Sequence, residues 1–133
     1  MPNAAVSTKS IPEKLQLKSG RSVIFVNKPT AYDETMGHLP AGVEIADSSC
    51  KSIDIIQIFA ESKQQLEKEL PKWKQVVAPK GMIWVTYPKG TSKMKSDINR
   101  DIIAAYAKTI GLEGVAIIAI DDDWSAVRLK ITS

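Results

Sequence analysis

The chain has 133 residues but contains one cysteine and one histidine. Cys50 cannot form a disulfide within the chain or build a cysteine-based zinc site, and we interpret it as a plain thiol. No stretch approaches the ~20 apolar residues of a membrane-spanning helix, so we expect no membrane partner. Residues 1–10 lack a basic start followed by an apolar core. We therefore predict a disordered tail over 1–10, no secretory signal and a cytoplasmic location.

The rest of the composition is that of an ordinary globular protein. Apolar residues make up 44% of the chain, charged residues 25%, and the formal net charge is +3. We expect a single α/β domain over residues 11–133. Six lysines (72, 74, 80, 89, 93 and 95) lie in a stretch without acidic residues. We interpret them as a solvated surface, because charge runs usually only solvate a surface, and we expect no nucleic-acid partner.

Five segments have the composition of strands, and a sixth is a candidate. They are Arg21–Asn27, Ile53–Ala60, Met82–Tyr87, Val115–Ile120 and Trp124–Ile131, with a short candidate at Val43–Ala46. Met82–Tyr87 is uncharged and apolar or aromatic on both faces, which predicts a central strand covered on both sides. Pro88 has no N–H to donate and should end it. The last two strands are joined by so few residues that they must be antiparallel.

Helices are predicted between these strands. They are Ile11–Leu17, one turn at Tyr32–Met36, a helix beginning at Ser62, and Asp97–Ile110 with Gly111 as its stop. Ser62 and Gln65 have capping-box spacing. Leu66, Leu70, Trp73 and Val77 form one apolar stripe, interrupted by Pro71, where we expect a kink or two abutting helices. The segment 78–81 should end the helix.

The order of these elements predicts a three-layer, Rossmann-like α/β fold. Its sheet is mostly parallel, with a right-handed crossover and an antiparallel C-terminal hairpin. This architecture resembles that of the methyltransferases that use S-adenosylmethionine. In those enzymes an acidic residue and a glycine-rich loop follow the first strand, whereas here Val26–Tyr32 contains no glycine. The departure puts binding of that cofactor in doubt, and we expect no cofactor.

Several short motifs are spread over both halves of the chain. The N-terminal half carries Asn27-x-Pro29 and Leu39-Pro40-x-Gly42. The C-terminal half carries Ile83-Trp84-Val85, Pro88-Lys89, Ser92, Asp97, Gly111-Leu112 and Asp121-x-x-Trp124-Ser125. Together these motifs resemble a family of small bacterial proteins of unknown function. That family has tryptophan before its Pro-Lys pair, where this chain has Tyr87. The resemblance spans about residues 12–131 and implies a fold without implying an activity.

Candidate catalytic and metal-binding residues are few. His38 lies in a loop, and no serine or cysteine near it in sequence has the spacing of a nucleophile elbow, so we predict no catalytic residue. The run Asp121–Asp123 can bind Mg²⁺ or make a hairpin turn, and we predict the turn, because aspartate favours local hydrogen bonds there. We therefore expect no metal site.

The best candidate binding site follows the central strand. Small residues, lysines and a predicted helix start come together after it, and both the helix N-terminus and the lysines attract anions. The candidate anion site consists of Lys89, Thr91, Ser92, Lys93 and Asp97. We thus interpret the protein as a non-enzymatic module that binds a small anionic ligand or a protein partner. The alternative is a divergent methyltransferase-like enzyme with a degenerate cofactor loop.

Overall fold

The computed structural model describes residues 11–30, 32–37, 39–47, 49–89, 97–121 and 123–132. The predicted tail over 1–10 lies outside them. The strands are β1 (Ser22–Val26), β2 (Glu44–Ile45), β3 (Ile53–Phe59), β4 (Val77–Pro88), β5 (Leu112–Ala119) and β6 (Trp124–Ile131). The helices are α1 (Ile11–Lys14), α2 (Tyr32–Met36), α3 (Lys63–Lys74) and α4 (Arg100–Thr109).

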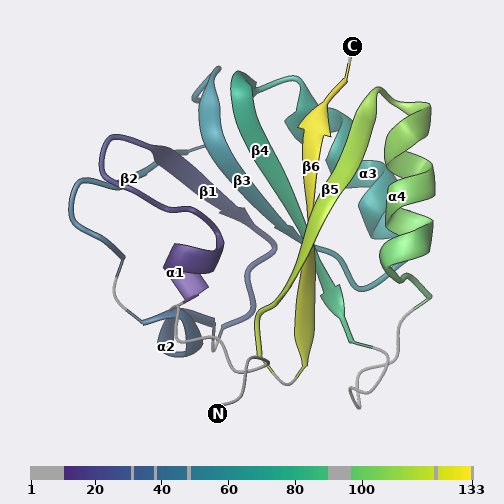
Figure 1. Cartoon of the computed structure of the whole chain (residues 1–133), viewed down its shortest axis with the longest axis horizontal. Helices are drawn as coiled ribbons and strands as arrows, with labels where there is room; N and C mark the ends of the chain where they lie inside the picture. Colours follow the sequence, from purple (N-terminus) through teal and green to yellow (C-terminus); the bar gives the residue numbers. More distant parts are fainter. Residues whose placement is uncertain are drawn as a thin grey trace.

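The strands form one sheet in the order β2-β1-β3-β4-β6-β5 (Figure 1). The pairs β2–β1, β1–β3 and β3–β4 are parallel, whereas β6 is antiparallel to both β4 and β5. The predicted Rossmann-like fold with a mostly parallel sheet and an antiparallel C-terminal hairpin is therefore confirmed.

Each face of the sheet has its own hydrophobic core. On one face, α3 and α4 supply buried side chains such as Leu70 and Ile103, which pack with Ile83 and Val85 of β4. On the other, Trp84 packs with residues from α2, β3 and β6 and with the segment that follows α1. The predicted division of β4 into two apolar faces is confirmed, and β4 is covered on both sides.

Helix α3 begins where the sequence predicts. The Ser62 hydroxyl accepts a hydrogen bond from the Gln65 N–H (3.1 Å), and the Gln65 side chain accepts one from the Glu61 N–H (2.8 Å). These bonds satisfy N–H groups that a helix start leaves without partners. Pro71 lies inside one continuous helix, so the expectation of two abutting helices was wrong.

Helix α4 begins later than predicted. Its N-cap is Asn99, whose side chain accepts from the Ile102 N–H (3.0 Å). The predicted start at Asp97 was wrong, because the Asp97 carboxylate instead accepts from the N–H of Lys63, the first residue of α3 (2.7 Å). Asp97 therefore ties the two helices of this face together, through a partner 34 positions away that the local pattern could not reveal.

Strand β4 begins at Val77, so the stop predicted over 78–81 was also wrong. Val77 pairs with Ile53 and Met82 with Ile55, so β4 advances five residues while β3 advances two. Residues 78–81 make up this irregular stretch, in which Gly81 lies against the backbone of β3. A Cβ atom at Gly81 would lie 2.6 Å from the Asp54 carbonyl oxygen.

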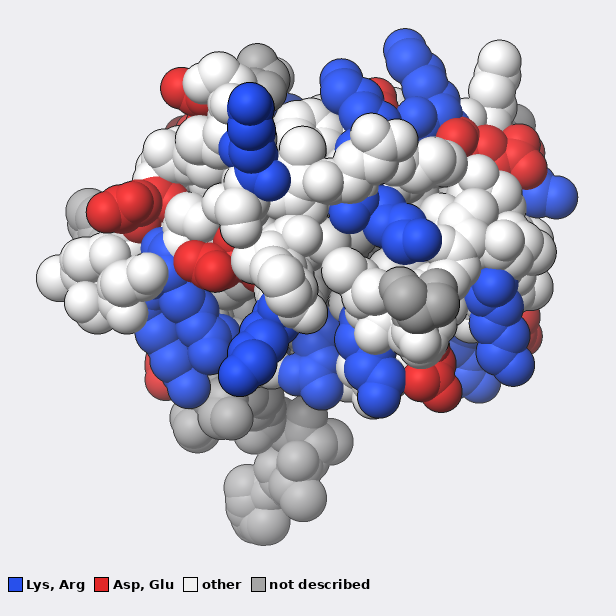
Figure 2. All heavy atoms as spheres, turned by 90° about the horizontal axis from the view of Figure 1, so that it is seen from above, with Lys and Arg blue, Asp and Glu red and all other residues white. Residues whose placement is uncertain are grey.

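The surface is mixed in charge. Seen from the edge where the parallel strands begin, basic side chains dominate, with single acidic side chains between them (Figure 2). Lys72 and Lys80 of the lysine-rich stretch are exposed and Lys74 is half-buried. None of the described helices is long and apolar enough to span a membrane.

Gly81→Ala should lower the free energy of unfolding by about 1–3 kcal/mol, because backbone atoms cannot move away from the new methyl group as a flexible side chain would. Gly114→Ala is the matched control, since a Cβ there would make an ordinary contact of 3.4 Å with Val127. Urea denaturation of both variants measures the difference. Equal stabilities would contradict the tight approach at Gly81.

Candidate functional site

The strand order reverses at β1. The chain leaves β1, passes through α2 on one face to reach β2, and later adds β3 on the other side of β1. In open α/β sheets, ligands bind outside the carboxyl ends of the strands at such a reversal. In Figure 1 these ends lie at the lower edge of the sheet, beside α2. Asn27–Thr30 follows β1 and Glu61 follows β3 at this edge. Strand β2 pairs with Ser22 and Val23, the first residues of β1, and Asp47 follows β2.

The loop after β1 turns sharply without glycine. Asn27 has φ 60°, a left-handed conformation that asparagine tolerates better than most residues. Its side-chain amide donates to Glu69 of α3 (3.5 Å), and the other carboxylate oxygen of Glu69 accepts from the Trp73 indole N–H (3.1 Å). Glu69 is buried, so Asn27 ties the loop to the helix on the α3 face.

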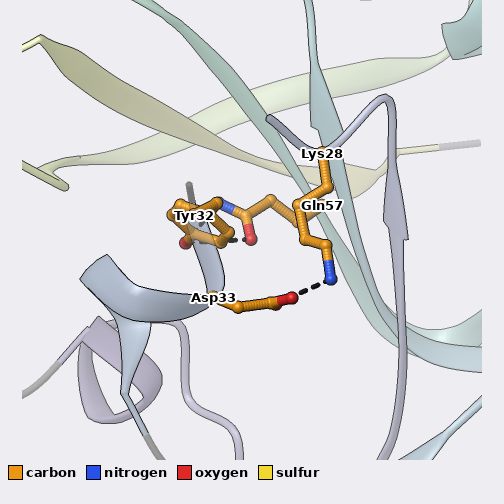
Figure 3. Close-up of polar contacts among 4 residues, drawn as sticks. All are labelled: Lys28, Tyr32, Asp33 and Gln57. Atoms are coloured by element: carbon orange, nitrogen blue, oxygen red, sulfur yellow. Dashed lines mark hydrogen bonds and ion pairs between the residues drawn. The ribbon is translucent and has the colours of Figure 1, made fainter. Parts of the chain in front are cut away.

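On the opposite face, α2 is anchored by a buried chain of hydrogen bonds (Figure 3). The Tyr32 hydroxyl lies 3.2 Å from Gln57 Oε1 and 3.1 Å from Gln57 Nε2, and Nε2 also donates to the Thr86 hydroxyl (3.0 Å). Gln57 and Thr86 are fully buried, in β3 and β4. Every buried polar side-chain atom in the described part of the chain has a partner. The network therefore fixes α2, and with it the loop after β1, to the middle of the sheet.

Aromatic rings pack edge-on against the ring of Tyr32. Tyr32 meets Phe59 edge-on with ring centroids 4.7 Å apart, and Phe59 meets Trp124 in the same way at 5.3 Å. Such pairs contribute about 0.5–1.5 kcal/mol beyond their buried area. Burial disfavours the phenolate and raises the pKa of Tyr32 to about 12. Tyr32 is therefore a neutral hydrogen-bonding anchor at physiological pH.

An ion pair joins the loop after β1 to α2. The Lys28 ammonium lies 2.7 Å from an Asp33 carboxylate oxygen (Figure 3). The same ammonium lies 5.6 Å from the centre of the Phe25 ring. Because both charged groups are reached by solvent, the pair contributes about 1 kcal/mol or less. It neutralises the lysine that follows β1.

Asp47 places an ionised carboxylate at the end of β2. It is exposed, and Oδ1 accepts hydrogen bonds from the Ser49 N–H (2.9 Å), the Ser49 hydroxyl and the Cys50 thiol (3.8 Å). The bonds from Ser49 are the main reason why the pKa of Asp47 is lowered. The candidate site residues predicted from the sequence did not include Asp47. The available signal was its position 20 residues after Asn27, where an acidic residue contacts ribose in nucleotide-binding α/β folds.

The residues of the predicted anion site are described only in part. Thr91, Ser92 and Lys93 lie outside the described residues. The Lys89 N–H donates to the Asp123 carbonyl (2.8 Å), and the Asp97 carboxylate is bound to the start of α3. The helix N-terminus next to Asp97 is therefore that of α3, and a protein carboxylate already binds it. The anion site itself stays a prediction.

The other candidates have structural roles where they are described. Asp121 Oδ1 accepts from the N–H groups of Asp123 (2.8 Å) and Trp124 (2.9 Å), which confirms the predicted turn. His38 and Asp122 lie outside the described residues. Within those residues, no group of three or more His, Cys, Asp or Glu side chains is placed to hold a metal ion.

Comparison with known proteins identifies the fold class. No protein-family model and no curated protein matches the sequence. Solved structures match in fold, among them a TehB-like SAM-dependent methyltransferase from Corynebacterium glutamicum (12% identity, 96% of this chain and 91% of that chain, TM-score 0.58). A SAM-dependent methyltransferase from Aquifex aeolicus is 16% identical, and the match covers 90% of this chain and 89% of that chain with a TM-score of 0.59. The ribosomal protein L11 methylase from Lactobacillus delbrueckii is 8% identical, and the match covers 92% of this chain and 75% of that chain with a TM-score of 0.60.

The fold is thus that of the Rossmann-like methyltransferases. This finding contradicts our interpretation of the chain as a non-enzymatic module and favours the methyltransferase-like alternative. The interpretation depended on the lack of a catalytic constellation, and the missing glycines after β1 were the reason to doubt binding of S-adenosylmethionine. Asn27 makes the left-handed turn there, so the absence of glycine does not exclude a sharp turn at the carboxyl edge.

Tyr32→Phe should lower the free energy of unfolding by about 1–3 kcal/mol, because the amide of the buried Gln57 loses a partner. Tyr106→Phe on the half-buried side of α4 is the matched control and should change stability by less than about 0.5 kcal/mol. Chemical denaturation measures both. A Tyr32→Phe variant as stable as its control would show that the network does not anchor α2.

The buried Tyr32 hydroxyl should also make the free energy of unfolding depend on pH in the alkaline range. Its folded-state pKa of about 12 exceeds the ordinary value of 10, so the unfolded chain loses this proton first as the pH rises. The stabilisation is fully present below pH 10 and is lost progressively between pH 10 and 12, by about 2–3 kcal/mol in total. Denaturation of Tyr32→Phe across this range should show a smaller loss than wild type. Parallel pH profiles would contradict the assignment.

Proposed function

We propose that the protein is a divergent methyltransferase-like enzyme that binds S-adenosylmethionine at the carboxyl edge of β1, β2 and β3. The observation that carries the proposal is the ionised, exposed carboxylate of Asp47 at the end of β2, in a fold shared with SAM-dependent methyltransferases. When bound, S-adenosylmethionine supplies an electrophilic methyl group from its sulfonium.

The residues at this edge are compatible with an adenosyl group. A carboxylate accepts two hydrogen bonds readily, which suits the ribose hydroxyls, and Asp47 is held in position by the turn at Ser49. Asn27 provides the left-handed turn after β1. Tyr32 lies on the face of the sheet below this edge, bonded to Gln57, and its role is to fix the loop. Asp47 would bind the ribose, and the loop that begins at Asn27 would flank the ligand.

Two expectations from the sequence, the family and the cellular location, also form part of the proposal. We propose that the chain belongs to the family of small bacterial proteins of unknown function that its Asn-x-Pro, Pro-Lys and Asp-x-x-Trp-Ser motifs resemble. We also propose a cytoplasmic location, where S-adenosylmethionine-dependent chemistry is expected.

Isothermal titration calorimetry with S-adenosylmethionine and its demethylated product, S-adenosylhomocysteine, tests the proposal. Asp47→Asn should weaken binding of both by about 10- to 100-fold, because hydrogen bonds to a charged acceptor are worth about 1.5–3 kcal/mol. Glu44→Gln is the matched control, since this exposed acid lies at the opposite end of β2.

Weaker binding by Asp47→Asn, together with equal affinities of wild type and Glu44→Gln, would support the site at Asp47. Absence of binding of either ligand by wild type at millimolar concentration would contradict the proposed function. Binding that Asp47→Asn leaves unchanged would contradict this placement of the ribose.

A further inference from the structure

The two edges of the sheet are very different. At one edge, β2 has two residues, and such short edge strands offer little for another chain to pair with. At the other edge, β5 has eight residues, and no strand of the described chain pairs with its outer side (Figure 1). Val115 is 38% exposed and Ile117 48% exposed on this strand. The β5 edge is therefore long and apolar.

Hydrogen bonds at the end of β5 show which backbone groups face outward. The Ile120 N–H donates to the Trp124 carbonyl (2.9 Å), whereas the Ala119 carbonyl accepts from the Lys14 ammonium (3.0 Å) and so faces away from β6. Because backbone groups alternate along an antiparallel strand, the N–H and C=O of Ile117 also face outward. Ile117 thus presents both a backbone pair and an exposed apolar side chain.

Few of the devices that block edge pairing are present at β5, where the Lys14 ammonium covers one outward carbonyl, that of Ala119. The strand contains no lysine and no proline, the residues that proteins commonly use to protect an edge. Its one charged residue, Glu113, lies 3.7 Å from the Lys130 ammonium of β6. The irregularity between Gly114 and Ala116 leaves a regular stretch from Ala116 to Ala119. This stretch is uncharged and can pair with a copy of itself without placing like charges opposite each other.

Helix α4 flanks the same edge. Arg100, Asp101 and Ala104 line a groove of about 390 Å³ together with residues of β5. Asp101, Ala104 and Lys108 are spaced three and four residues apart and so share one side of α4. This side carries an acid in the first turn of the helix, a small residue in the middle and a base in the last turn.

We propose that two copies of the chain form a dimer by antiparallel pairing of β5 with β5, with Ile117 at the two-fold axis. A two-fold axis makes the two α4 helices antiparallel, which brings Asp101 of each copy towards Lys108 of the other. Charge complementarity and the long apolar edge select a second copy of this chain as the occupant. The dimer is independent of the proposed function.

Sedimentation equilibrium over a range of protein concentrations tests the dimer. Wild type should have twice the 14.6 kDa mass of the chain at tens of micromolar. Ile117→Lys should be a monomer, because it places two lysines together at the axis, and its half-exposed position lets the fold tolerate the change. Ile45→Lys is the matched control on the short edge, where the side chain is 61% exposed, and should remain dimeric.

Charge reversal tests the arrangement of the helices. Asp101→Lys should weaken the dimer about tenfold or more by setting lysines against each other, and Asp101→Lys with Lys108→Asp should restore it. A monomeric wild type, a dimeric Ile117→Lys variant, or a double variant no tighter than Asp101→Lys would each overturn the proposal. Circular dichroism of every variant verifies that the fold is retained.

Discussion

The hydrogen bond between Tyr32 and Gln57 determines the geometry of the carboxyl edge. Gln57 is a fully buried amide in the middle of an apolar sheet, and burying an amide without partners is costly. Tyr32 and Thr86 satisfy it, and in doing so they fix the short helix α2 against β3 and β4. Helix α2 has five residues and could not hold its place by helix propensity alone. The loop after β1 is positioned because this anchor holds.

The second attachment of that loop lies on the opposite face. Asn27 reaches Glu69 on α3, so the loop is tied to both layers that enclose the sheet. Between these ties, Asn27 follows β1, and Asp47 follows the neighbouring parallel strand β2. Ligand binding in this architecture is concentrated at such an edge, and the methyltransferase-like fold agrees with that location. The proposed adenosyl site follows from the placement of a few residues on a rigid scaffold.

The sequence was sufficient for the fold because its signals there are local. Alternation assigned Trp84 and Ile83 to opposite faces, and the capping box located the start of α3. The sequence was insufficient wherever a residue binds a segment that is distant along the chain. Asp97 has the local pattern of a helix start but binds the first N–H of α3. Pro79 and Gly81 are typical of a loop, yet they lie in the irregular first part of β4. The pairing of Tyr32 with Gln57 across 25 residues has no local signal.

We place the proposed adenosyl ligand at the carboxyl edge beside β1 and β2. Backbone amide chemical shifts of the isotope-labelled protein, titrated with S-adenosylhomocysteine, test this placement residue by residue. We expect the largest shifts at Asn27, Lys28, Asp47 and Ser49, with little change at Lys80 or Lys130 near the opposite edge. Shifts concentrated at that opposite edge, or no shifts at millimolar ligand, would contradict it.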